Sequence, residues 1–110
     1  MVKGHRIEKK VEIQTFLDTI KNYTKDQINT TNHTFFRLDE KQRKIFKDEV
    51  LKDHLLTKIP ILVGIQFNGN YAVFYDYSKN EVLRLMLDIQ PSKIEIVTFY
   101  LPDKTQVPRL

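Results

Sequence analysis

The residues best suited to acid–base chemistry lie in one short stretch, Thr31-Asn32-His33-Thr34-Phe35-Phe36-Arg37. If a helix begins near His33, then His33 and Arg37 stand four residues apart on one helix face. A histidine can take or give a proton near neutral pH, and an arginine can stabilise negative charge on a phosphate. Together with a tyrosine, this pair suits metal-free cleavage of an RNA strand, in which a 2′-hydroxyl attacks the adjacent phosphate. The competing interpretation is an ordinary surface helix, where a histidine and an arginine at this spacing are common.

Other kinds of chemical site have little support. The chain has no cysteine, which excludes disulfides, thiolate metal ligands and cysteine nucleophiles. Its three histidines, His5, His33 and His54, lie far apart, and none has a second histidine at helical spacing, so we expect no metal site. The three glycines do not form a phosphate-binding loop, and we therefore expect no cofactor.

The elements that must position these residues form a helical part followed by an extended part. Apolar residues recur at helical spacing from Arg6 to Tyr23 and again from Phe35 to Leu56, with a polar connector or short edge strand between them. The second stretch fits one long helix or two short ones. After Pro60 the chain has four runs rich in β-branched and aromatic residues, namely Ile61 to Phe67, Tyr71 to Tyr77, Glu81 to Asp88 and Lys93 to Leu101.

Short breaks such as Asn68-Gly69-Asn70 connect antiparallel neighbours. We therefore predict a single α+β domain over residues 1–110, with N-terminal helices packed on a four-stranded antiparallel β-meander. The helical half covers about residues 6–57, the meander about 60–101 and a C-terminal tail 102–110. No apolar run is long enough to span a membrane and no signal segment opens the chain, which favours a cytoplasmic protein without a membrane partner.

Strict alternation divides the last strand into two faces, one with Ile94, Ile96, Thr98 and Tyr100 and the other with Val97, Phe99 and Leu101. Neither face is cleanly polar. The second face of the sheet should therefore be partly covered by the first helix, by the tail or by another chain.

The chain carries 18 Lys+Arg and 14 Asp+Glu, which gives a formal net charge of +4 at pH 7. The first 52 residues hold 12 Lys+Arg and 8 Asp+Glu, so the whole excess lies in the part of the chain that contains His33 and Arg37. This excess permits an anionic partner such as RNA without demanding one.

The order of these features resembles the small RelE/ParE-like and BrnT-like toxin domains of the barnase, EndoU, colicin and RelE class of ribonuclease folds. The resemblance covers about residues 28–101, and its motifs are short. It consists of a strand-like Ile28 to Thr31, a Thr-x-His followed by Arg37, a helix with Glu49-Val50-Leu51, and a meander that ends in Ile94 to Tyr100. Many proteins of this class are metal-independent ribonucleases that an antitoxin holds inactive, and others have no known activity.

The resemblance implies roles for individual residues. His33 would be the acid or base, and Arg37 would contact phosphate. Thr98 and Tyr100 match the end of the last strand and would position the substrate. For Arg84, inside the third predicted strand, a phosphate contact or a structural ion pair are the alternatives. Further substrate contacts are expected from Arg43 and Tyr75. Two departures are Lys41, where the family often has a second arginine, and the additional helix before Ile28.

We therefore expect a toxin-type domain, either an active endoribonuclease or a degenerate relative. Its expected partners are RNA, an antitoxin protein and a second copy of the chain. One alternative is a non-catalytic protein whose apolar second sheet face forms a homodimer or binds a partner. The other is a plain RNA-binding module, in which Tyr71, Tyr75 and Tyr77 stack on bases or, in the simpler interpretation, only pack within the sheet.

Overall fold

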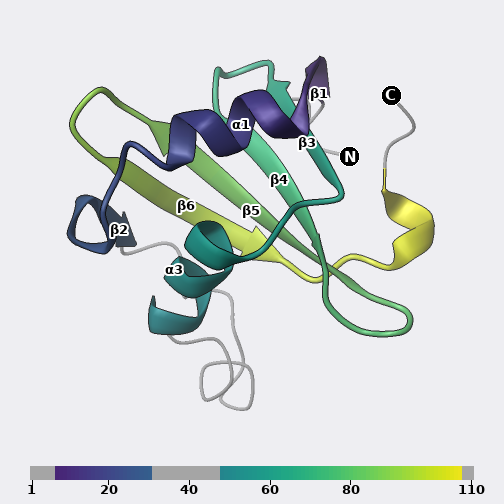
Figure 1. The fold of residues 1–110 in the computed structure, drawn as a ribbon. Coiled ribbons are helices and arrows are strands. Elements are labelled where there is room, and N and C mark those ends of the chain that lie inside the picture. The colour runs from purple at the N-terminus through teal and green to yellow at the C-terminus, as the bar shows by residue number, and fades with distance from the viewer. Residues whose placement is uncertain (1–6, 31–47, 108–110) are drawn as a thin grey trace.

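The structure is a computed structural model that describes residues 7–30 and 48–107. Its main feature is a six-stranded mixed sheet with the strand order β1-β3-β4-β5-β6-β2 (Figure 1). Neighbouring strands are antiparallel except for β2, which pairs in parallel with β6. The strands are β1 (Ile7–Val11), β2 (Ile28–Thr30), β3 (Leu62–Gln66), β4 (Tyr71–Asp76), β5 (Val82–Ile89) and β6 (Ile94–Tyr100).

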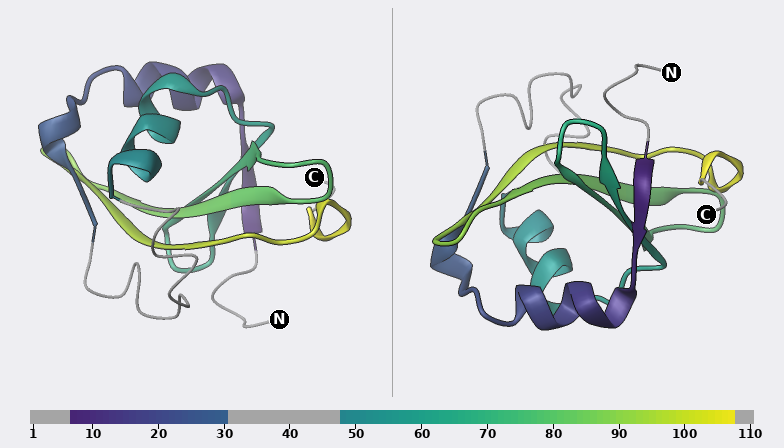
Figure 2. Two further views of the ribbon diagram at one scale, coloured as in Figure 1. Left: turned by 90° about the horizontal axis from the view of Figure 1, so that it is seen from below. Right: turned by 90° about the horizontal axis from the view of Figure 1, so that it is seen from above.

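Two helices, α1 (Ile13–Ile20) and α3 (Asp48–Thr57), lie on the same side of the sheet (Figure 2). We call this side the helix face, and the opposite side, which carries neither helix, the helix-free face. Phe16 and Ile20 of α1 are buried because their four-residue spacing places both on the side of the helix that meets the sheet. Neither helix of the described residues is long and apolar enough to cross a membrane.

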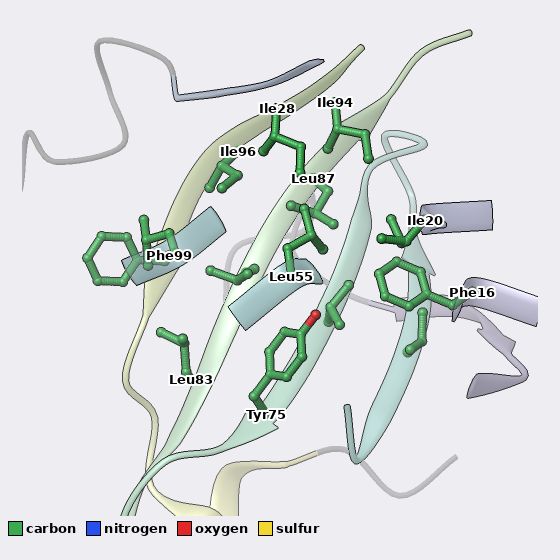
Figure 3. Close-up of a cluster of buried hydrophobic side chains, with 14 residues drawn as sticks. Phe16, Ile20, Ile28, Leu55, Tyr75, Leu83, Leu87, Ile94, Ile96 and Phe99 are labelled. Carbon is green, nitrogen blue, oxygen red and sulfur yellow. The ribbon is translucent and has the colours of Figure 1, made fainter. Parts of the chain in front are cut away.

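Most of the hydrophobic core lies between the helix face and the two helices (Figure 3). A second, smaller cluster lies on the helix-free face, where Val107 of the tail packs against it. The middle strands β4 and β5 are therefore buried on both faces, which explains their nearly continuous apolar sequences. The main cluster consists of Phe16, Ile20, Ile28, Leu51, Leu55, Val63, Val73, Tyr75, Leu83, Leu85, Leu87, Ile94, Ile96 and Phe99. The second consists of Leu62, Ala72, Phe74, Val82 and Met86.

Hydrogen bonds to the turn between β5 and β6 hold the segment that leads into β2. The Tyr23 hydroxyl donates to the Gln90 carbonyl oxygen at 2.6 Å, and the Gln27 amide donates to the Ser92 carbonyl oxygen at 3.2 Å. The chain therefore enters β2 beside the start of β6, and the two strands run in the same direction. This arrangement places Ile28 against Ile94 in the core.

The predicted fold class is wrong, because the sheet has six strands and is mixed rather than a four-stranded antiparallel meander. Strands β3 to β6 correspond to the four predicted runs, and β2 lies where a connector or short edge strand was expected, but β1 comes from a stretch that was expected to be helical. The helix expected from Arg6 to Tyr23 is replaced over Ile7–Val11 by a strand that pairs with β3. The second expected helix is described only from residue 48, where α3 begins.

Candidate functional site

Three of the residues predicted to contact RNA lie together on the helix-free face. Arg84 on β5 is the register partner of Tyr100 on β6, and Thr98 is the partner of Met86. Partners in register project from the same face of a sheet, so Arg84, Thr98 and Tyr100 point to one side. All three side chains are half-buried.

A β-bulge in β6 produces this alignment. Leu87 pairs with Ile96 and Met86 pairs with Thr98, so that Val97 is the extra residue of the bulge. Ile96 consequently faces the helices, whereas Thr98 faces the opposite side. The expectation that Ile94, Ile96, Thr98 and Tyr100 share one face is therefore wrong, and the bulge is the reason.

The Arg84 side chain is held above an aromatic ring. Its Cζ atom lies 5.1 Å from the centroid of the Phe74 ring, which is within the range of cation–π interactions. Phe74 is also the register partner of Arg84 on β4, so the sheet itself fixes this contact. Burial lowers the pKa of the Arg84 guanidinium, and the nearby Tyr100 partly opposes this shift. The guanidinium stays protonated at neutral pH, and the site is therefore a partly desolvated cation between an aromatic ring and a tyrosine.

Tyr75 lies on the other side of the sheet. It pairs with Leu83 and is buried in the main core (Figure 3). Its ring centroid is 5.9 Å from that of His54. A substrate contact requires an accessible side chain, so this position does not suit the role predicted for Tyr75. His33, Arg37 and Arg43 lie outside the described residues.

The buried hydroxyl of Tyr75 should make the stability of the protein depend on alkaline pH. In the part of the chain that the structure describes, this hydroxyl has no hydrogen-bond partner, and burial raises its pKa. Above about pH 10, tyrosine ionises in the unfolded chain but not in the folded one, so the free energy of unfolding falls as the pH rises. Relative to Tyr75→Phe, the wild-type protein should lose about 1.4 kcal/mol for each further pH unit.

Urea unfolding of both proteins between neutral pH and pH 11 checks this expectation. Tyr77→Phe, at an exposed position, is the matched control and should follow the wild-type profile. Parallel profiles for the wild type and Tyr75→Phe would contradict the buried, neutral state of this hydroxyl.

Gln66 is a polar residue on the helix-free face that the sequence patterns did not single out. The residue is only 1% exposed, and within the described residues neither its amide Nε2 nor its Oε1 has a hydrogen-bond partner. Burying an amide without partners costs about 1–3 kcal/mol, so this residue calls for an explanation beyond packing. The sequence feature that could have identified Gln66 is that it is the single amide within the apolar run from Ile61 to Phe67.

The described residues offer no alternative metal centre, since no group of three or more histidine, aspartate or glutamate side chains is arranged to hold an ion. Together, the fold and this face define a small α+β protein with a half-buried cationic site on its sheet. The MJ0788 family model matches residues 14–87, which is more than half of the chain. The chain therefore belongs to the MJ0788 family.

The matched segment runs from α1 into β5, so it includes Gln66, Phe74 and Arg84 and ends before Thr98 and Tyr100. The family description states no function, and the match does not show a relationship to the RelE, ParE or BrnT toxins. Searches of curated proteins and of solved structures found no match to the chain.

Proposed function

We propose that the protein binds RNA through the helix-free face, with Arg84 as a phosphate contact. The observation that carries this proposal is the position of Arg84, which is half-buried over Phe74 and directly opposite Tyr100. A partly desolvated guanidinium favours an anion that can accept two parallel hydrogen bonds from its planar N–H groups, and the oxygens of a phosphate can accept them. The net charge of +4 is in keeping with such a partner.

The exposure of the neighbouring side chains favours RNA over a protein partner. Phe74 and Met86, the large apolar residues beside Arg84, are already buried within the chain. Ile7, Val97 and Val107 are half-buried apolar residues on this face, and the half-buried residues that can bond to or stack on a nucleotide are Arg84, Thr98 and Tyr100. A protein partner usually needs an accessible apolar centre, whereas a nucleic acid needs cations, hydroxyl donors and aromatic rings.

The toxin resemblance extends the proposal to strand cleavage without a metal. The 2′-hydroxyl oxygen would attack the adjacent phosphorus while the bond from phosphorus to the 5′ oxygen breaks. A base takes the hydroxyl proton and an acid protonates the leaving oxygen. We assign one of these two proton transfers, as base or acid, to His33, and the other proton is exchanged with solvent. Arg37 and Arg84 stabilise the charge on the phosphate.

Labelled, unstructured RNA incubated with the purified protein in a chelator tests both parts of this proposal. We expect saturable binding by fluorescence anisotropy and cleavage products on a denaturing gel. The variant His33→Ala should keep the binding and lose the cleavage. Binding without any cleavage would reject the catalytic part, and the absence of binding would reject the proposal as a whole.

A further inference from the structure

We propose that Gln66 reads a nucleobase, and that the base is adenine. This inference rests on the proposed RNA binding by the same sheet face. A glutamine amide carries one donor and one acceptor side by side, and it pairs with the N6 and N7 atoms of adenine through two hydrogen bonds. RNA-binding proteins commonly recognise bases that are splayed out of a single strand in this way.

The register places Gln66 on the same face as Arg84. Leu62 pairs with Phe74, and Phe74 pairs with Arg84, so these three side chains share the helix-free face. Gln66 lies four residues after Leu62 on the same strand, and alternation returns it to that face. Two strand spacings and four residues of rise separate the Cα atoms of Gln66 and Arg84 by roughly 16 Å. One RNA strand crossing the face would therefore meet Arg84 with a phosphate and Gln66 with the base of another nucleotide.

Both polar groups of the Gln66 amide, although buried, lack a hydrogen-bond partner among the described residues. Buried amides in folded proteins are almost always satisfied, and here both the donor and the acceptor are without a partner. Packing does not require this residue, because an apolar side chain of the same length would fill the space without the unsatisfied groups. The edge of a base would supply hydrogen-bond partners to both the amide N–H and the amide oxygen of Gln66.

The surroundings of Gln66 suggest how a base could enter. A Cβ atom on Gly64 would lie 2.5 Å from Cγ2 of Ile7, which shows that Ile7 packs directly over Gly64. Ile7 is also the register partner of Gln66, at the end of the edge strand β1. The register of β1 shifts between Ile7 and Lys9, so Ile7 is not held by a continuous ladder. An incoming base would take the place of the Ile7 side chain without disturbing β4 or β5.

The test uses two oligouridine RNAs that differ only at one central position. One carries adenine there, and the other carries purine, which lacks the N6 amino group. The wild-type protein should bind the adenine RNA roughly tenfold more tightly than the purine RNA. Gln66→Met, which keeps the length and removes the amide, should bind both RNAs equally. Because it loses an unsatisfied amide, this variant should also melt at a higher temperature than the wild type.

Arg84→Met separates the two proposals, because it should weaken binding to both RNAs by the same factor. If the wild type binds both RNAs equally well, or if Gln66→Met keeps the preference, the assignment of Gln66 is overturned while RNA binding stands. If the wild type binds neither RNA, the proposed function fails first. The comparison of the two RNAs with the wild type needs no variant, so it holds even where a substitution impairs folding.

Discussion

Replacing Arg84 with methionine is expected to weaken the binding of unstructured RNA by about 10- to 100-fold. A charge-assisted hydrogen bond contributes about 1.5–3 kcal/mol, and each 1.4 kcal/mol corresponds to a factor of ten in affinity. Methionine preserves much of the packing against Phe74, since its thioether contacts aromatic rings favourably.

Lys21→Met is the matched control for this variant. Lys21 follows α1, is exposed and is paired with Asp18, so the control removes the same charge from a surface away from the helix-free face. The affinity for RNA should change little in the control. The slope of log affinity against log salt concentration should decrease by about one in Arg84→Met, which corresponds to the loss of one phosphate contact, and should stay unchanged in Lys21→Met. Equal losses in the two variants would mean that the chain attracts RNA by overall charge rather than through Arg84.

Phe16→Ala is expected to lower the free energy of unfolding by about 3–5 kcal/mol. The Phe16 side chain is 1% exposed, and its ring centroid lies 6.2 Å from that of Tyr71 in the sheet. Helix α1 is only eight residues long, and no side chain caps its N-terminus. Such a short helix is marginal by itself, so the burial of its apolar side is what holds it. The loss would be a large part of a total stability of about 5–15 kcal/mol.

The matched control is Phe67→Ala, because Phe67 is 64% exposed in the turn after β3. The same chemical change at that position should alter the stability by about 0.5 kcal/mol or less. Urea unfolding followed by circular dichroism measures both variants. Similar losses for Phe16→Ala and Phe67→Ala would contradict the packing of α1 on the helix face.

The sequence predicted the strands whose signals are local. Hairpin turns and apolar runs mark β3 to β6, and Gly69 takes the positive φ of 89° that the turn after β3 requires. Strand β1 was missed because Ile7 and Val11 are four residues apart, a spacing that also fits a helix, and because its partner β3 lies far along the chain. Strand β2 has three residues and pairs in parallel with β6, so its pairing depends on distant contacts.

The candidate site was predictable only in part, for a similar reason. Arg84, Thr98 and Tyr100 were identified by residue type, but their common face depends on the bulge at Val97, which has no clear local signal. The burial of Tyr75 follows from its pairing with Leu83 beneath the helices, which the sequence does not reveal. Gln66 became a candidate only when its burial and missing partners were known.

The most direct test of RNA binding by the helix-free face is an NMR titration with unstructured RNA in a chelator. We expect the side-chain signals of Arg84, Phe74 and Tyr100 to shift in proportion to the RNA bound. The signals of the exposed residues of α1 and α3, on the opposite side of the sheet, should stay in place. Shifts confined to α1 and α3, with the Arg84 guanidinium signal unchanged at saturation, would contradict the account.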